Sequence, residues 1–240
     1  MDRYIDMHCH ILPGVDDGAQ NLEETRQMLQ IAFNEGTRLI IATPHHHPRR
    51  GHKRPEILNK QLRLVRAEAA KISDKFRIYL GTEVFFGQDV PEKINRGEIL
   101  AMNKRNTVLL EFSPSDSYDY IRQGVQQVQM TGNQVIIAHA ERYQCLLDDI
   151  GYAEELCDMG ASIQVNAGSI IGDGGRRAKK FVKELMDEDM VFGVGTDAHG
   201  VQTRAPKMKK AADYVKKKYG EEYMRRIFFD NAATLLRKRK

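Results

Sequence analysis

The sequence predicts an α/β fold, a distorted (β/α)7 barrel of the TIM-like kind, formed by one domain over residues 1–240. Short runs rich in Ile, Val and Leu alternate with longer amphipathic stretches about seven times, at a spacing of roughly 30 residues. Such alternation is typical of parallel strands joined by helices, and about seven units of this length fit a closed barrel better than an open sheet. The chain contains no linker, low-complexity block or break in composition that would separate a second domain.

The expected strands are short and apolar on both faces, as in a sheet that helices cover. They are residues 4–9, 38–43, 76–84, 107–112, 134–139, 162–166 and 191–196. Amphipathic helices are expected after them, at residues 21–35, 55–72, 90–95, 118–131, 151–159, 176–187 and 206–219. Asn21 followed by Glu24 has the form of a capping box, and residues 172–175 are expected to form a loop before a helix. Two short helices, 221–229 and 231–236, are expected to close the chain.

Composition excludes several classes of protein. Hydrophobic residues make up 41% and charged residues 29% of the chain, which is enough apolar material for a core and too much for a disordered chain. Apolar runs such as 39–42 and 135–138 are far shorter than the roughly 18 residues of a membrane helix, so no integral membrane segment is expected. The first residues lack the basic-then-apolar layout of a signal peptide, which favours a cytoplasmic protein.

The three cysteines, Cys9, Cys145 and Cys157, indicate neither a disulfide framework nor a paired zinc motif. They are odd in number and widely spaced, and we expect them to be reduced and buried. None is followed six residues later by an arginine, which excludes the active-site loop of cysteine-dependent phosphatases.

The net charge of +4 is unevenly distributed, because residues 204–240 contain 13 Lys/Arg and 4 Asp/Glu. We interpret this basic part as a solvated helix face followed by a tail at 237–240. The alternative is a contact for nucleic acid, anionic lipid or an acidic protein. No nucleic-acid partner is expected, and strongly salt-dependent DNA binding would favour the alternative.

Metal-binding side chains follow nearly every expected strand, at the end where a barrel of this kind builds its active site. Residues two apart on a strand share a face, so His8 and His10 point together, and so do Asp197 and His199. The sixth strand offers only Asn166. The four carboxylates and five imidazoles of the full set are those of His8, His10, Asp17, His45, Glu83, Glu111, His139, Asp197 and His199.

So many ionisable groups are costly to bury unpaired at one barrel mouth, and divalent metal ions are the simplest compensation. Nine ligands are too many for one ion and suit two or three, with a carboxylate such as Glu83 as a bridge. The mixture of histidine and carboxylate without thiolate favours Mn, Fe or Zn. Cys9 lies between two candidate ligands on its strand, so it should face away from them into the core.

Two arginines stand near the candidate ligands: Arg142 is three residues after His139, and Arg204 is five residues after His199. The planar guanidinium fork matches phosphate and carboxylate, although each arginine alone is equally well explained as a surface residue. Three divalent ions and four carboxylates would leave about two positive charges for a phosphate dianion, which favours phosphoester hydrolysis.

A third basic feature follows the histidine triplet at 45–47: Arg49, Arg50, Lys53 and Arg54. These residues form either a loop that steers anions to the site or a solvated turn. No general acid for the leaving group is identified.

Several motifs resemble the PHP (polymerase and histidinol phosphatase) superfamily, and within it the bacterial manganese-dependent protein-tyrosine phosphatases of capsule and exopolysaccharide operons. They are Asp6-Met7-His8-Cys9-His10, Asp16-Asp17-Gly18, Thr43-Pro44-His45-His46, Gly81-Thr82-Glu83, Leu110-Glu111-Phe112, Ala138-His139-Ala140-Glu141-Arg142-Tyr143 and Thr196-Asp197-Ala198-His199. The likeness follows nearly the whole chain in order, which is far more specific than a single motif.

The resemblance implies the PHP fold, a phosphate site at Arg142 and Arg204, and Mn as the metal, with Fe, Zn or Mg as alternatives. It implies one metal on His8, His10, Glu83 and Asp197, a second on Glu83, Glu111 and His139, and a third on Asp17, His45 and His199. The implied substrate is the phosphotyrosine cluster of a membrane-associated tyrosine autokinase that regulates polysaccharide synthesis and export.

Three other functions stay open at this point. One is a phosphoesterase of the same superfamily that acts on histidinol phosphate or a nucleotide. Another is a metal-dependent amidohydrolase, which also carries His-x-His on a barrel strand but often bridges its metals with a carboxylated lysine, where this chain has Glu83 and Glu111. The last is a catalytically silent module that binds metal or nucleic acid.

Overall fold

The computed structural model describes residues 3–104 and 106–236, so the basic tail at 237–240 lies outside the described residues. The strands are β1 (Tyr4–Cys9), β2 (Thr37–Ala42), β3 (His45–His46), β4 (Arg77–Leu80), β5 (Glu83–Phe85), β6 (Thr107–Glu111), β7 (Gln134–Ile137), β8 (Ser162–Asn166) and β9 (Val191–Gly195). The helices are α1 (Leu22–Asn34), α2 (Pro55–Ile72), α3 (Val90–Asn95), α4 (Tyr118–Gln129), α5 (Gln144–Asp148), α6 (Gly151–Asp158), α7 (Ala167–Ile171), α8 (Gly175–Asp187), α9 (Lys209–Tyr219), α10 (Glu221–Arg225) and α11 (Asn231–Thr234). Single turns of other helix types are η1 (Met102–Lys104), η2 (Ala140–Arg142) and η3 (Arg226–Asp230).

These strands pair in parallel and form two sheets, with the orders β1-β2-β4 and β3-β5-β6-β7-β8-β9. β3 continues the line of β2 and β5 that of β4, because Ala42 pairs with Leu80 and His45 pairs with Glu83 in the same register. The strands therefore occupy seven positions, with breaks at residues 43–44 and 81–82.

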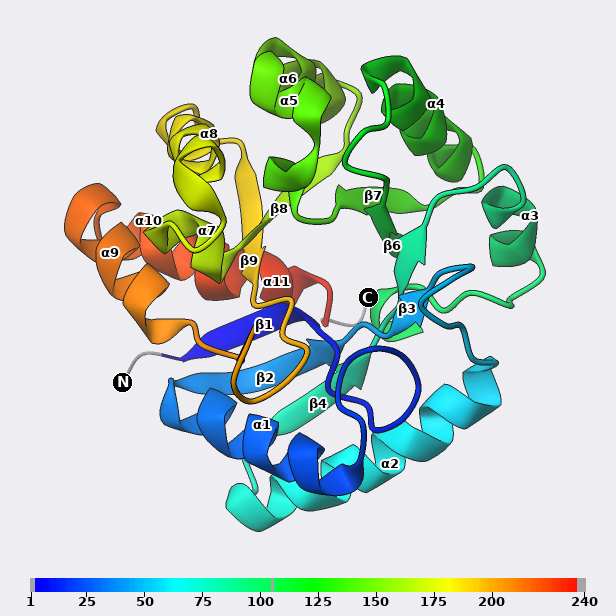
Figure 1. Ribbon diagram of the computed structural model, residues 1–240, viewed down its shortest axis with the longest axis vertical. Coiled ribbons are helices and arrows are strands. Elements are labelled where there is room, and N and C mark those ends of the chain that lie inside the picture. Colours follow the sequence, from blue (N-terminus) through cyan, green and yellow to red (C-terminus); the bar gives the residue numbers. More distant parts are fainter. Residues whose placement is uncertain (1–2, 105, 237–240) are drawn as a thin grey trace.

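The remaining edges of the two sheets meet where β1 and β9 end. The backbone N–H of His10 donates to the carbonyl of Ala198 (2.9 Å), and that of Asp197 donates to the carbonyl of His8 (2.7 Å). No regular ladder between β1 and β9 is present in the described residues. The result is the predicted α/β architecture, a distorted barrel with the strands at its centre and the helices outside them (Figure 1).

Some expected element boundaries are wrong. The expected strand 76–84 is two strands, because the chain breaks at Gly81, where an added Cβ would lie 2.5 Å from Met102 Sδ. The two-residue strand β3 and the short helices α5 and α7 were not expected, and helix 206–219 begins only at Lys209. The expected loop at 172–175 separates α7 from α8.

The predicted cap at the start of α1 is confirmed in part. The Asn21 side chain accepts from the Glu24 N–H (3.0 Å), as expected of the N-cap, whereas the Glu24 carboxylate accepts from the N–H of Gln20 (2.9 Å) and not from that of Asn21. Cys9 is fully buried in the core, as expected, whereas Cys145 and Cys157 are only half-buried. All three are free thiols. Among the described residues, no helix is both long and apolar enough to cross a membrane.

The contact between β1 and β9 positions the polar end of the barrel. The buried Asp6 carboxylate accepts from the N–H (2.9 Å) and the hydroxyl (2.5 Å) of Thr196. Gly195 allows the two chains to approach, since a Cβ there would lie 2.5 Å from the Cβ of His8. The first and last strands thereby bring their terminal side chains together.

Candidate metal centre

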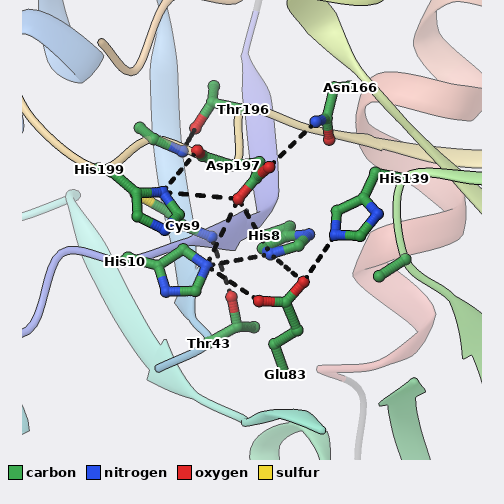
Figure 2. Close-up of polar contacts among 12 residues, drawn as sticks. His8, Cys9, His10, Thr43, Glu83, His139, Asn166, Thr196, Asp197 and His199 are labelled. Atoms are coloured by element: carbon green, nitrogen blue, oxygen red, sulfur yellow. Dashed lines mark hydrogen bonds and ion pairs between the residues drawn. The ribbon is translucent and has the colours of Figure 1, made fainter. Parts of the chain in front are cut away.

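The nine predicted ligands converge at the carboxyl ends of the strands. Figure 2 shows six of them, His8, His10, Glu83, His139, Asp197 and His199, pointing toward one another. Three overlapping sets of ligand atoms lie within 4.8 Å of each other: His8, His10 and Asp197; His45, Glu83 and Glu111; and His10, Asp17, His45 and His199. The side chain of Asp17 is 47% exposed, whereas the other eight are buried or nearly so.

The first set is formed by β1 together with the end of β9. The Nε2 atoms of His8 and His10 each lie 3.2 Å from a Glu83 oxygen and 3.5 Å from Asp197 Oδ1. The same two Nε2 atoms are 3.2 Å apart. Four side chains therefore present ligand atoms to one small volume, as the His-x-His spacing predicts.

Glu83 connects the first set to side chains from β3, β6 and the end of β7. Its Oε1 lies 2.9 Å from His139 Nε2, and its Oε2 lies 2.8 Å from His45 Nδ1. Glu111 lies 3.7 Å from both of these rings. Glu83 thus occupies the central position expected of a bridging carboxylate.

The third set lies at the solvent side. Asp17 Oδ1 is 3.2 Å from His45 Nε2 and 3.4 Å from His199 Nε2. His45 faces two sets at once, with Nδ1 toward Glu83 and Nε2 toward Asp17. The sets in the structure share His10 and His45, whereas the sets that the resemblance implies share Glu83 alone.

Several of these buried atoms have no hydrogen-bond partner among the described residues. They are both ring nitrogens of His45, Oε2 of Glu83, Oε2 of Glu111, Nδ1 of His139 and Nε2 of His199. His45 Nδ1 and Glu83 Oε2 are in contact at 2.8 Å, but not in hydrogen-bond geometry. Buried polar atoms are rarely left unsatisfied, and a cation between these donors would satisfy them. The residues present therefore fit divalent metal ions.

Electrostatics agree with this interpretation. Burial opposes ionisation of Glu83 and Asp197, yet the His8 charge next to both carboxyls holds the pKa of each well below its usual range. Burial and the Glu83 charge raise the pKa of Glu111 to about 7. Burial opposes protonation of His45, but Asp17 and Glu83 raise its pKa to about 9. Without metal, protons replace part of the missing positive charge.

Strand β8 contributes two amides that orient the ligands. Gln164 Oε1 lies 3.0 Å from His8 Nδ1 and accepts the His139 N–H (2.9 Å). Its Nε2 donates to Asn166 Oδ1 (2.9 Å), and Asn166 Nδ2 donates to Asp197 Oδ2 (3.1 Å). Because Nδ1 of His8 is engaged by an acceptor, its Nε2 is free to be a ligand. The sequence analysis singled out Asn166 and missed Gln164, although the two-residue strand period places both on one face.

Asp16 is a second residue that sequence analysis did not assign. Its Oδ2 lies 2.9 Å from His10 Nδ1 and accepts the His45 N–H (2.9 Å), while Oδ1 accepts the Gly18 N–H (3.0 Å). Asp16 therefore orients His10 from behind. It lies in a loop, where no periodicity distinguishes it from its neighbour Asp17.

Both predicted arginines reach the ligand cluster. Nη2 of Arg142 and Nη2 of Arg204 each lie 2.5 Å from Asp197 Oδ2. Their side chains are 35% and 41% exposed and line a cavity of about 970 Å³ that also contacts Glu141 and Asn166. Two guanidinium groups thus stand between the ligand cluster and an open cavity, so neither is an isolated surface residue.

The chain is similar to known proteins over nearly its whole length. The family model described as capsular polysaccharide synthesis, CpsB/CapC, matches residues 4–237. The chain is 32% identical to tyrosine-protein phosphatase CpsB of Streptococcus pneumoniae, over 97% of this chain and 98% of that protein. It is 30% identical to tyrosine-protein phosphatase YwqE of Bacillus subtilis, over 97% of this chain and 91% of that protein.

Solved structures repeat these similarities. The chain matches, with a TM-score of 0.89 and 29% identity, a structure from work on YwqE and CpsB that describes them as unique metal-dependent tyrosine phosphatases. That match covers 97% of this chain and 94% of the other. Histidinol phosphate phosphatase from Lactococcus lactis, solved with zinc, L-histidinol and phosphate, shares the fold, with a TM-score of 0.60 and 15% identity over 90% and 94% of the two chains.

Fold and site together define a metal-dependent hydrolase built on a distorted α/β barrel. The chain belongs to the CpsB/CapC family of capsular polysaccharide synthesis proteins. This membership confirms the resemblance on which the sequence analysis relied.

The orienting amides give a first prediction. Gln164→Leu removes the acceptor for His8 Nδ1 and for the His139 N–H, and we expect the affinity for Mn to fall by about 10- to 100-fold. The measurement is a titration of metal-stripped protein with Mn by calorimetry. Gln126→Leu, an exposed change on α4, is the matched control and should bind Mn like the unchanged protein. A folded Gln164→Leu variant with unaltered affinity would contradict the orienting role.

The protons in the metal-free centre give a second prediction. The pKa values of His45 (6.5 to about 9) and Glu111 (4.5 to about 7) are raised on folding, so the native protein binds more protons than the unfolded chain. Its free energy of unfolding without metal should therefore fall as the pH rises through these values. Mn must displace the same protons, so the thermal stabilisation by Mn should grow from pH 6.5 to about 8. Thermal unfolding with and without Mn tests both trends, and a stabilisation that shrinks over this range would contradict them.

Proposed function

We propose that the chain is a metal-dependent protein-tyrosine phosphatase, which releases phosphate from a phosphotyrosine protein of capsule or exopolysaccharide synthesis. The main support for the proposal is that the two oxygens of the Asp197 carboxylate contact different groups. Its Oδ1 lies among the ligand atoms, whereas its Oδ2 contacts Arg142 and Arg204. A metal site and a phosphate-binding fork therefore share one side chain, and relatives that cover nearly the whole chain are tyrosine-protein phosphatases.

We further propose the metal ligands that the sequence predicts. The first ion would be held by His8, His10, Glu83 and Asp197, the second by Glu83, Glu111 and His139, and the third by Asp17, His45 and His199. Divalent ions held there supply charge to neutralise the phosphoryl oxygens and lower the pKa of water. We propose Mn as the resident ion, with Fe, Zn and Mg as the alternatives to be tested.

The chain's own residues bind and orient the substrate. Arg142 and Arg204 direct their guanidinium groups to the rim of the large cavity, where each can donate to phosphate oxygens while keeping its contact with Asp197. Gln164 and Asp16 hold His8 and His10 in fixed orientations, so the site needs little rearrangement when substrate binds.

We propose a membrane-associated tyrosine autokinase as the partner, and a single domain over residues 1–240 as the unit that meets it. We propose the cytoplasm as the place where the two proteins meet, because a tyrosine kinase needs ATP. The glutamates at the centre of the site support a phosphatase over an amidohydrolase that depends on a carboxylated lysine, since no lysine is buried among the described residues.

The experiment that tests the proposal is phosphate release by metal-stripped protein after addition of Mn. A phosphotyrosine peptide is compared with a phosphoserine peptide and with histidinol phosphate. We expect release from phosphotyrosine to be restored by Mn and to exceed release from the other two. Preference for histidinol phosphate would assign the protein to metabolism, and no metal-dependent release would reject the phosphatase assignment.

The arginine fork gives a separate prediction. Arg142→Ala should reduce kcat/KM for a phosphotyrosine peptide by about 100-fold, because one charged donor to phosphate is lost. Mn content should stay normal, since the ligand atoms remain. Arg177→Ala is the matched control: it lines the same cavity, but its partner is the exposed Asp148. Equal loss of metal and activity in Arg142→Ala would contradict the assigned role.

A further inference from the structure

A second cavity, of about 520 Å³, opens on the metal centre between the loop at 47–51 and the ends of β5 and β6. It adjoins the charged cavity at Arg142, because Pro114 lines both cavities. One lining residue, Glu111, is also a predicted metal ligand. The other walls that matter here are apolar or planar: His47, Pro48, Phe85 and Pro114. We name these four residues with Arg50 and Glu111 the ring slot.

Strand register places the ring slot next to the ligands. His45 on β3 pairs with Glu83 on β5, and both are predicted ligands. Residues two further along each chain share the same face, so His47 and Phe85 follow about 6.6 Å farther out. Their rings are in contact, with centroids 4.3 Å apart and planes at 62°. An aromatic pair therefore forms the next layer above a pair of metal ligands.

The loop that covers the slot has a defined shape. The His47 N–H donates to the Gly51 carbonyl (3.0 Å), and the Gly51 N–H donates to the His47 carbonyl (3.3 Å). The backbone N–H groups of Arg49 and Arg50 donate to His47 Nδ1 (2.9 and 3.1 Å), which holds the imidazole in place. Arg50 then lies at the metal end of the slot, with Nη1 3.3 Å from Glu111 Oε1. The Arg50 side chain is 44% exposed, so it can also contact a bound substrate.

We propose that the ring slot receives the phenyl ring of the substrate phosphotyrosine and that Arg50 faces the phenolic oxygen that leaves. The inference rests on the proposed phosphatase function and names its aromatic subsite. A flat aromatic ring matches walls of phenylalanine, histidine and proline. The ring slot lies two residues along the strands from the predicted metal ligands. This spacing suits phosphotyrosine, with its phosphorus among the ligands and its ring just outside them.

The chemistry needs a positive group at this place. As water oxygen forms its bond to phosphorus, the bond from phosphorus to the phenolic oxygen breaks, and its electron pair stays on that oxygen. A phenol has a pKa of about 10, so the leaving oxygen carries substantial negative charge near neutral pH. Arg50 stabilises that charge until the phenolate takes a proton from solvent. The attacking water gives one proton to solvent as its oxygen bonds to phosphorus, so the products are tyrosine and inorganic phosphate.

Two variants test the slot on Mn-loaded full-length protein. Arg50→Ala should lose about 100-fold in kcat/KM on phenyl phosphate and much less on 2,4-dinitrophenyl phosphate, whose phenolate needs little stabilisation. Phe85→Ala should raise KM for a phosphotyrosine peptide by about 10-fold, and Phe85→Tyr, which keeps a ring, should restore it. Lys60→Ala, an exposed change on α2 outside the slot, is the control and should behave as the unchanged protein.

The outcomes separate the two proposals. An unchanged protein that releases no phosphate from phosphotyrosine with Mn rejects the phosphatase function, and the ring slot with it. An active protein in which Arg50→Ala loses equally on both aryl phosphates, and Phe85→Ala keeps its KM, rejects the ring slot alone. Arg50 is half-exposed, so its variant keeps the test decisive even where Phe85→Ala fails to fold.

Discussion

The structure depends on the burial of one carboxylate among imidazoles. Glu83 is fully buried and lies 2.8–3.2 Å from ring nitrogens of four histidines, which come from β1, β3 and the end of β7. Elements distant in sequence must therefore end at the same point. The breaks in the strands and the glycine at 195 serve this convergence, because they let the chains approach where a regular ladder with larger side chains would keep them apart.

Asp197 extends this constraint from the metal ligands to the substrate. Its Oδ1 faces the histidines, while its Oδ2 accepts from Arg142 and Asn166 and forms an ion pair with Arg204. One side chain therefore links the histidines to the two arginines. The backbone reflects the demand. Asp197, His139 and Arg204 have positive φ angles of 52°, 32° and 53°, a region that residues other than glycine rarely adopt. Such strain persists where surrounding contacts impose it, and here it aims functional side chains.

Sequence reasoning succeeded where a period organises the chain. The repeated strand and helix units predicted the barrel, and the two-residue spacing of His8 with His10 predicted a pair of side chains that the structure brings together. Asp197 and His199 also lie close, at 3.6 Å, but they follow the end of β9 and Asp197 has a positive φ angle, so the strand period does not relate them. It failed where no period exists. Asp16 and Arg50 lie in loops whose shape comes from contacts with distant strands, and the break at Gly81 follows from packing on Met102. Gln164 could have been predicted to face the site, because it lies two residues from Asn166 on the same strand.

Charge explains why β8 carries no candidate metal ligand. The nine candidate ligands already include four carboxylates, and a further acid on β8 would add repulsion at the place where phosphate must bind. The Gln164 amide contacts His8 Nδ1 and accepts the His139 N–H through its oxygen, and it donates to Asn166 through its nitrogen. A histidine ring would not fit these three contacts. An amide accepts and donates without adding charge, whereas an ionised carboxylate cannot donate. The strand without a ligand therefore orients ligands from three other parts of the barrel, and its neutrality leaves the positive charge of the site available to the substrate.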